Sequence, residues 1–300
     1  MERPFSTPAV AADAAAVTEV VAALESSLYG PSTFSQADLE DEWSELDLER
    51  DARVVRDGDR IVGYGVVREK GVPWRVEGYV HPDALGRGIG KLIATELEDD
   101  AVRRGARRIQ NSVLEADPAA RRLLESLGYG AVRVFREMRI ELEAPPPAPE
   151  WPDGLRVVPF DPERDALDFH AAHEEAFADT WDYAPRDFES WSRGHLGSER
   201  FDPTLWCVVR AGSEIAAGTI STANTYGGGF VHTLFTRRPW RRQGVGAALL
   251  RESFGRFWER GERSVGLGAD AESDTGAFRL YERAGMTPAL GWVMYEKALR

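Results

Sequence analysis

The sequence predicts an α+β protein made of two domains of similar size and build. Three observations predict it: a glycine-rich turn occurs twice, other landmarks recur around it at a nearly constant offset, and a proline-rich segment separates the two copies. A chain of 300 residues also fits two domains of about 150 residues, each large enough to bury its own core. We therefore expect a duplicated fold.

The glycine-rich turn reads Leu85-Gly-Arg-Gly-Ile-Gly90 in the first copy and Arg241-Arg-Gln-Gly-Val-Gly246 in the second. Each turn follows a strand-like run and precedes a helix-like run. The first N–H groups of a helix lack intrahelical partners and carry partial positive charge, so they attract anions such as phosphate. Glycine lets a ligand approach the backbone and adopts unusual φ and ψ angles at little cost. The turns therefore predict two phosphate cradles.

Landmarks on both sides of the turn recur in the same order. Val54-Val55-Arg56 recurs as Val208-Val209-Arg210 at an offset of 154 residues, and Gly128 recurs as Gly285 at an offset of 157. Solenoid units are only about 20 to 50 residues long. A repeat of this length is therefore a duplicated domain.

The segment between the copies, residues 143–154, reads EAPPPAPEWPDG. Prolines cannot donate ladder hydrogen bonds, and they favour extended, semi-rigid geometry. The sequence thus predicts an N-terminal domain over residues 1–143, a linker over 144–153 and a C-terminal domain over 154–300.

The second copy shows the periodicities of an α+β unit. In order, we expect a strand at 155–159, a helix at 165–179, a polar and aromatic stretch through 191, strands at 206–210, 214–221 and 230–236, a helix beginning after 242, a strand at 264–267, a helix at 275–284 and a closing strand at 292–298. The first copy follows the same order.

Two familiar phosphate loops do not fit the turns. A Walker A loop fails because Gly90-Lys91 is followed by Leu92, and neither copy contains the dinucleotide fingerprint G-x-G-x-x-G. The pattern that remains, R-x-x-G-x-G, is matched by Arg241, Gly244 and Gly246. It resembles the acyl-CoA pyrophosphate loop of the GNAT (Gcn5-related) N-acetyltransferases, and the order of elements is the one this family requires.

The resemblance implies two tandem GNAT folds, each a mixed, mostly antiparallel twisted sheet flanked by helices, with acyl-CoA in a splayed gap between the fourth and fifth strands. It also implies acetyl-CoA as co-substrate, an amine as acceptor and no metal. The residues it assigns to acetyl-CoA are Leu234, Phe235, Thr236, Arg241, Arg242, Gln243, Gly244, Val245 and Gly246, with Arg87, Gly88 and Gly90 in the first copy.

The resemblance assigns a catalytic acid to the second copy. Ala277-Phe-Arg-Leu-Tyr-Glu-Arg-Ala-Gly-Met286 matches the family's A-x-x-L-Y-E-x-x-G-[FM], which places Tyr281 near the thioester sulfur. A phenol is protonated at neutral pH and can donate to a thiolate. The first copy has Leu124 there and Leu85 at the loop arginine. We therefore expect an altered first domain and a catalytic second domain.

The general base is harder to assign. Alternation along 230–236 would put Phe230, His232, Leu234 and Thr236 on one face. A histidine side chain ordinarily titrates at about pH 6.5, so His232 could accept an ammonium proton, directly or through water. The alternative is a histidine that only packs.

The first helix of the second copy carries His170, His173, Glu174 and Glu175. They favour contact with the acceptor over a metal site, because no third ligand is suitably spaced. The following aromatic and acidic stretch, 181–191, would either wall the acceptor pocket or only pack.

Composition excludes several function classes. The net charge of −13 argues against nucleic acid as a partner. No window approaches the roughly 18 apolar residues of a membrane span, and no signal peptide is evident, so we expect a cytoplasmic protein. Cys207 is the only cysteine, which excludes an intrachain disulfide, and we expect it to be buried in a strand.

These observations favour transfer of an acetyl group from acetyl-CoA to a primary amine, such as that of a small molecule. Two alternatives stay open: a non-catalytic acyl-CoA-binding protein, and an enzyme that acetylates protein N-termini or lysines. The sequence does not determine the oligomeric state.

Overall fold

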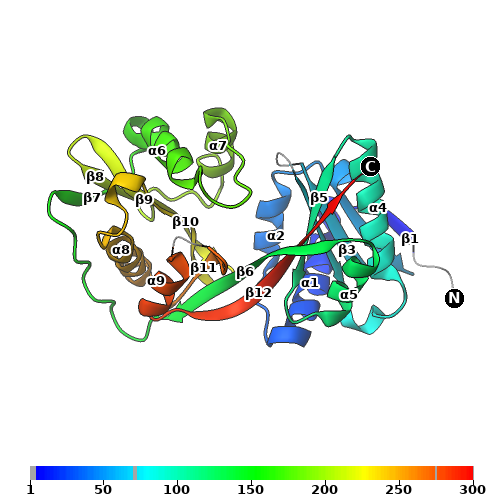
Figure 1. Ribbon diagram of the computed structural model, residues 1–300. Helices are drawn as coiled ribbons and strands as arrows, with labels where there is room; N and C mark the ends of the chain where they lie inside the picture. The colour runs from blue at the N-terminus through cyan, green and yellow to red at the C-terminus, as the bar shows by residue number, and fades with distance from the viewer. Residues whose placement is uncertain (1–4, 70–72, 274–275, 300) are drawn as a thin grey trace. The chain divides into compact units, whose positions relative to one another are not determined.

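The computed structural model describes residues 5–69, 73–273 and 276–299. They form two compact units: unit 1 comprises Met1–Arg136 with Leu290–Arg300, and unit 2 comprises Glu137–Ala289. The α+β class is confirmed, because each unit has a mixed sheet with helices on both faces (Figure 1). The bounds of the two units differ from those of the predicted domains. The chain passes from unit 1 to unit 2 after Arg136, and the predicted linker, residues 144–153, lies within unit 2.

The sheet of unit 1 has the strand order β1-β2-β3-β4-β5-β12. Its strands pair antiparallel, except for the parallel pair β4 and β5. The elements that lie wholly in unit 1 are β1 (Phe5–Pro8), η1 (Ala11–Asp13), α1 (Ala14–Tyr29), α2 (Gln36–Trp43), α3 (Leu48–Asp51), β2 (Ala52–Asp57), β3 (Arg60–Arg68), β4 (Trp74–Val80), η2 (Pro82–Ala84), α4 (Ile89–Arg103), β5 (Arg108–Leu114) and α5 (Pro118–Ser126).

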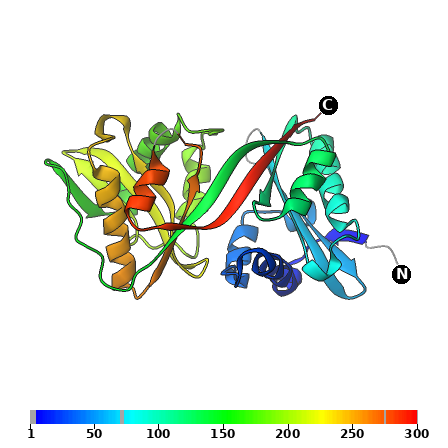
Figure 2. The same cartoon turned by 60° about the horizontal axis from the view of Figure 1, so that its bottom comes forward.

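Helices cover both faces of this sheet, with α1 and α2 on one side and α4 and α5 on the other (Figure 2). The division follows strand alternation, because neighbouring residues of a strand point to opposite faces. Val54 and Val66 pack in the cluster formed with α1 and α2, whereas Val55 and Val67 pack in the cluster formed with α4 and α5.

The sheet of unit 2 has the order β6-β11-β10-β9-β8-β7. Strands β7 to β10 pair antiparallel, and β10 and β11 pair parallel. The elements that lie wholly in unit 2 are β7 (Leu155–Pro159), α6 (Pro162–Phe177), α7 (Phe188–His195), β8 (Cys207–Ala211), β9 (Glu214–Thr225), β10 (Gly228–Thr236), η3 (Arg238–Trp240), α8 (Val245–Glu259), β11 (Ser264–Asp270) and α9 (Ala277–Arg283). Helices α6 and α7 cover one face, and α8 and α9 cover the other (Figure 1).

The predicted elements of the second copy are present, with shifted ends. Helix α7 forms inside the stretch for which the sequence predicted no element; it begins after Asp187, whose carboxylate accepts a hydrogen bond from Ser190 N at 2.8 Å. Such a cap satisfies one of the free donors at a helix start. Cys207 is buried in β8 as expected.

The last strands of the two copies are exchanged. Strand β6 (Gly130–Glu141) ends in unit 2, whereas β12 (Thr287–Ala298) ends in unit 1. There β12 pairs with β5 from Trp292 opposite Leu114 to Ala298 opposite Arg108. The prediction that this strand closes the second copy is therefore wrong. Both strands carry an alternating apolar pattern, which specifies the buried face of a strand but not the sheet that it joins.

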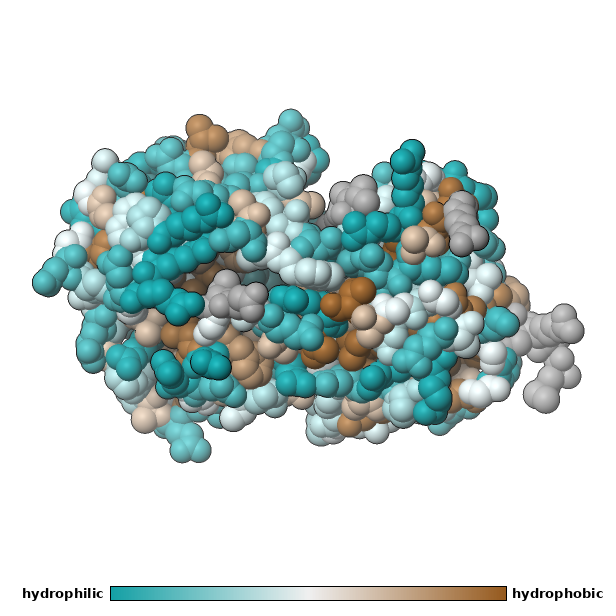
Figure 3. Space-filling view, in the orientation of Figure 1, coloured by the Kyte–Doolittle hydropathy of each residue, from teal (hydrophilic) through white to brown (hydrophobic). Residues whose placement is uncertain are grey.

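The surface is rich in hydrophilic residues. The face shown in Figure 3 is mostly hydrophilic, with hydrophobic residues in small scattered patches. Among the helices of residues 5–69, 73–273 and 276–299, none is long and apolar enough to cross a membrane.

Candidate active site

In unit 2 the glycine turn leads directly into α8. Gly244 precedes the helix in the left-handed region, at φ +86°. A Cβ there would meet no atom within 4 Å, so glycine serves the backbone conformation and leaves room for a ligand. A Cβ on Gly246 would come within 3.2 Å of Leu280 Cδ2 on α9. This second glycine therefore serves the close approach of two helices, rather than the ligand.

Unit 1 builds its turn in the same way. Gly88 precedes α4 at φ +81°, and a Cβ on Gly90 would come within 3.1 Å of Leu123 Cδ2 on α5. Both units thus present the free N–H groups of a helix N-terminus to solvent, which suits a pyrophosphate.

The arginines at the turn of unit 2 have different environments. Arg241 donates to Thr236 O at 3.0 Å and Ala176 O at 2.7 Å, and it pairs with Asp179 at 2.9 Å. The hydrogen bond from Arg241 lowers the pKa of Asp179 below its usual range. Arg241 therefore ties the end of β10 to the C-terminus of α6.

Arg242 is the arginine left for a ligand. It is exposed, and no partner for its side chain is found in the described part of the chain. Its φ of +63° is left-handed, a conformation that costs a non-glycine residue of the order of 1 kcal/mol. Unit 1 has Gly86 at the same point of the turn, at φ +75°. An exposed arginine held at this cost suggests a functional role.

Strands β10 and β11 pair over only three residues. Gly229 to Val231 pair with Val265 to Leu267, and the pairing recorded for the described residues ends there. From Thr233 to Thr236, β10 pairs with β9 alone. The other edge of β10 therefore has free backbone groups that an extended amide ligand can pair with. Unit 1 repeats the feature, since β4 and β5 pair only over Trp74–Glu77 and Ile109–Ser112.

A β-bulge in β10 changes which residues share a face. A Cβ on Gly229 would contact Phe257 of α8, yet Phe235, six residues later, packs on Phe169 of α6. Strict alternation would put Gly229 and Phe235 on one face. The register shift between Val231 and Thr233 inserts one residue, so Gly229 and Phe235 lie on opposite faces. The prediction that His232 shares a face with Leu234 and Thr236 is therefore wrong.

The bulge residue is His232. Strand β4 of unit 1 pairs with β3 without a register shift, so His232 is an extra residue with no counterpart there. Bulges commonly lie beside active sites, where they redirect a side chain. His232 is exposed on the face opposite α8.

A polar network contacts His232 on this face. His232 Nε2 lies 2.8 Å from Thr222 Oγ1, which lies 2.8 Å from Thr225 Oγ1. Arg200 donates to Thr225 Oγ1 at 2.9 Å. This network could not be predicted from the sequence, because its members come from three separate segments and match no motif.

Tyr281 lies on α9 next to Leu280, the residue that contacts the glycine turn. Its side chain is 8% exposed, and no hydrogen-bond partner for its hydroxyl is found within residues 5–69, 73–273 and 276–299. Burial raises the pKa of Tyr281 to about 12. The phenol therefore keeps its proton at neutral pH, as a proton donor must.

Unit 1 lacks this chemistry at the matching positions. Leu124 is 2% exposed and packs in the core. Arg87 pairs with Asp57 at 2.7 Å, and Leu85 is exposed. The helix start and free strand edge persist in unit 1, whereas the proton donor does not.

The cluster on α6 fixes a neighbouring segment. Glu174 accepts a hydrogen bond from Arg186 N at 3.1 Å, and His170 Nε2 lies 2.8 Å from Arg186 O. His173 packs between Phe177 and Phe235, and burial lowers its pKa. These contacts hold residues 181–187 against α6. Within the described ranges no group of three or more His, Cys, Asp or Glu residues is arranged to hold a metal ion.

Comparison with known proteins shows the family to which the chain is similar. The model described as "Acetyltransferase (GNAT) family" matches residues 18–129 and 166–286, one match in each half of the chain. A mycothiol acetyltransferase of Thermobispora bispora is 34% identical over 255 residues, which cover 80% of this chain and 81% of that protein.

Solved structures match the whole chain. A GCN5-related N-acetyltransferase from Sphaerobacter thermophilus matches with a TM-score of 0.87 at 35% identity, covering 100% of this chain and 97% of that one. A tandem GNAT protein from the clavulanic acid biosynthesis pathway matches with a TM-score of 0.76 at 18% identity, covering 98% of each chain. The second match shows that the tandem fold is shared.

Proposed function

Because this chain belongs to the GNAT family of acetyltransferases, we propose that it transfers the acetyl group of acetyl-CoA to a primary amine, by direct attack in unit 2. The observation that carries the choice of unit is the buried, protonated Tyr281 on α9, where unit 1 has Leu124. The relative named mycothiol acetyltransferase supports a small-molecule acceptor.

Acetyl-CoA would bind at the start of α8 and along the free edge of β10. The pyrophosphate accepts hydrogen bonds from the N–H groups that follow Gly244, and Arg242 supplies a positive charge beside them. The amide groups of the pantetheine arm pair with the backbone of Leu234 to Thr236. The side chains of Leu234 and Phe235 pack away from this edge, so only their backbone groups take part.

The chemistry then needs one base and one acid. His232, exposed on β10, accepts a proton from the ammonium group of the acceptor, directly or through a water molecule. The free amine attacks the thioester carbonyl carbon, and a C–N bond forms. As the C–S bond breaks, Tyr281 donates its proton to the departing thiolate, and the second proton that the nitrogen loses as it becomes an amide restores the phenol through solvent.

The test is an acetyl-transfer assay of the full chain with a panel of acceptors. Amino sugars, amino acids, polyamines and peptides are each incubated with acetyl-CoA; thiol release is followed and the product is identified by mass. We expect an N-acetylated product from one class of small amine. Thermal stabilisation by acetyl-CoA without thiol release from any acceptor would support an acyl-CoA-binding protein instead. Turnover with peptides alone would support a protein N-acetyltransferase.

A further inference from the structure

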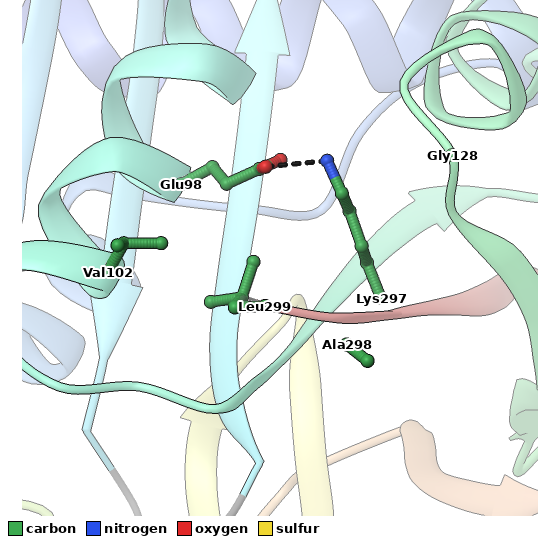
Figure 4. Close-up of a pocket in the computed structure, with 6 residues that line it drawn as sticks. All are labelled: Glu98, Val102, Gly128, Lys297, Ala298 and Leu299. Atoms are coloured by element: carbon green, nitrogen blue, oxygen red, sulfur yellow. Dashed lines mark hydrogen bonds and ion pairs between the residues drawn. The ribbon is translucent and has the colours of Figure 1, made fainter.

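Unit 1 contains a pocket in which the charged side chains pair with one another (Figure 4). The pocket is lined by Glu98, Val102, Gly128, Lys297, Ala298 and Leu299. Lys297 extends from β12 toward Glu98 on α4, with its Nζ 2.5 Å from one carboxylate oxygen, and Tyr129 OH donates to the other oxygen at 3.1 Å. The directions of these hydrogen bonds are fixed, because an ammonium group can only donate and a carboxylate can only accept.

The network at the bulge of unit 2 contains groups that can act in both ways. It joins His232 to Thr222, Thr222 to Thr225, and Thr225 to Arg200. A hydroxyl has one hydrogen to donate and can accept two hydrogen bonds, and a neutral imidazole has one donor nitrogen and one acceptor nitrogen. The distances by themselves therefore do not determine the tautomer of His232. The groups at the end of the network determine it, because each of them acts in one way only.

Thr225 Oγ1 has three polar contacts within the described part of the chain. Arg200 lies at 2.9 Å and can only donate, Ala223 O lies at 3.2 Å and can only accept, and Thr222 Oγ1 lies at 2.8 Å. Thr225 is 2% exposed, and buried polar groups are almost always hydrogen-bonded. If its single hydrogen pointed at Thr222, Ala223 O would face an oxygen with no hydrogen between them. All three contacts are satisfied only when Thr225 donates to Ala223 O and Thr222 donates to Thr225.

The direction at Thr225 determines the direction at His232. Because Thr222 donates its only hydrogen to Thr225, its oxygen can only accept from His232 Nε2, which lies at 2.8 Å. Nε2 therefore carries the hydrogen of the neutral ring, and Nδ1 is the nitrogen without one. The imidazole also contacts the ring of Phe230, with 5.0 Å between the ring centres. A hydrogen bond and a ring contact thus both restrain the imidazole.

We propose that Thr222 is a positioning residue for His232: it accepts the Nε2 hydrogen and thereby makes Nδ1 the nitrogen that takes a proton from the ammonium group of the acceptor. This inference rests on the role proposed above for His232 as the base. When Nδ1 takes the proton, Nε2 keeps its hydrogen, and the hydroxyls of Thr222 and Thr225 keep their directions. In the other tautomer both hydroxyls would have to turn at every proton transfer. The network therefore stays preorganised while the charge changes.

NMR of the full chain, labelled with ¹⁵N in its five histidines, tests the tautomer without any substrate. Spectra are recorded at about pH 8.5, roughly two units above the ordinary pKa of histidine, and the signals of His232 are those that disappear in His232→Gln. We expect Nε2 to resonate as a protonated nitrogen and Nδ1 as an unprotonated one. The Nε2 proton should itself be visible, because its hydrogen bond slows exchange with water. A protonated Nδ1, or signals averaged over both tautomers, would overturn the proposal.

Variants of Thr222 provide the second test, because imidazole in water also favours the form protonated at Nε2. Thr222→Val is nearly isosteric and lacks the hydroxyl, so the signal of the Nε2 proton should disappear. Thr222→Ser keeps the hydroxyl and should keep the signal. Thr287→Val, the same change at an exposed residue of β12, is the control. Unfolding curves confirm that each variant is folded. A signal of the Nε2 proton that persists in Thr222→Val would show that Thr222 does not hold it.

Acetyl transfer tests whether Thr222 acts through His232. Thr222→Val should lower kcat/KM for the acceptor about tenfold, because the base is no longer held in place, and Thr222→Ser should restore it to within about twofold. KM for acetyl-CoA should not change. In the background of His232→Gln, Thr222→Val should have no further effect, whereas a merely structural role would lower kcat/KM equally in both backgrounds. Equal losses in the two backgrounds would overturn the positioning role.

Failure of the proposed function has a different signature. If His232→Gln kept its full kcat/KM, the base would lie elsewhere, and the role of Nδ1 in the reaction would be refuted with it. The tautomer of His232 and its dependence on Thr222 are decided by NMR in the absence of substrate. The two failures are therefore distinguishable.

Discussion

Units 1 and 2 place the same glycine turn at the same point of the same fold, but they fill the space around it differently. Both begin a helix after a left-handed glycine, and both leave one edge of a strand unpaired beyond a short parallel pair. Unit 2 adds Tyr281, Arg242 and the bulge residue His232; unit 1 has Leu124, Gly86 and no bulge. The shared features build the backbone, and the differences concern side chains that we propose to act in unit 2.

The faces beside the free strand edges differ most. In unit 1 the guanidinium of Arg68 pairs with Glu42 at 2.8 Å and Glu77 at 3.3 Å, with 15% of its side chain exposed. Burial alone would lower the pKa of Arg68, but Glu77 and Glu42 raise it above its ordinary value. In unit 2 the position of Arg68 is taken by Thr222, which contacts His232. In unit 1 a network of ion pairs therefore covers this face of the sheet. In unit 2 the same face presents polar groups.

A duplicated domain can divide its roles in this way. Helix starts and strand pairing depend on glycine and on the apolar pattern, which both copies retain. Catalysis depends on a few side chains, and their replacement leaves the fold intact.

Substitutions in the exchanged strands β6 and β12 should have the largest effect, which is a loss of stability. Tyr295 of β12 and Met138 of β6 are fully buried at equivalent positions. Each change to alanine should lower stability by about 3–4 kcal/mol, but in different units. Hydrogen exchange should rise in β5 for Tyr295→Ala and in β11 for Met138→Ala. The opposite pattern would show that the strands are not exchanged; Val132→Ala, at an exposed position, is the control.

Removal of the proposed acid comes next. Tyr281→Phe should lower kcat about 100-fold, because the thiolate would leave without a proton donor. Leu124→Ala should change kcat less than twofold, although it destabilises unit 1. Since the pKa of Tyr281 is raised to about 12, activity should not fall through loss of this proton between pH 7 and 10. Equal effects of the two variants on kcat would refute catalysis in unit 2.

Changes at the bulge test the base. His232→Gln keeps a partner for Thr222 but cannot accept a proton, so kcat/KM should fall about 30-fold and the acidic limb of its pH profile should disappear. The matched change in unit 1 is Glu77→Gln, at the strand position beside the point of the bulge, and it should leave the profile unchanged. A pH profile of His232→Gln that retains the acidic limb would assign the base elsewhere.

Changes to the arginines of the turn should have the smallest effects. The two variants should change stability in opposite directions. Arg242→Gly, which copies Gly86 of unit 1, should raise stability by about 1 kcal/mol by relieving the left-handed backbone and raise KM for acetyl-CoA about tenfold. Arg241→Ala should lower stability by about 1–2 kcal/mol, because it removes the bonds to Thr236 O and Ala176 O. If Arg242→Gly left KM unchanged, the side chain would have no role in binding.

Local patterns account for what could be predicted. The paired glycine turns, the apolar periodicities and the match around Tyr281 are properties of short segments, and they led to the α+β class, the duplication and the family. The face of His232 was mispredicted because one inserted residue shifts every later side chain to the other side of a strand. The sequence could not distinguish the roles of Arg241 and Arg242, because two adjacent arginines do not indicate which one donates hydrogen bonds to backbone carbonyl groups in the folded chain.

The sequence by itself determined that this protein is a tandem pair of acetyltransferase folds, and where their helices and strands lie. Only the tertiary structure decided which sheet receives each last strand and which arginine of the turn is left exposed. Periodicity and motifs follow from neighbours along the chain. Strand partners, ion pairs and cavities follow from residues that are distant in the sequence and meet only when the chain has folded.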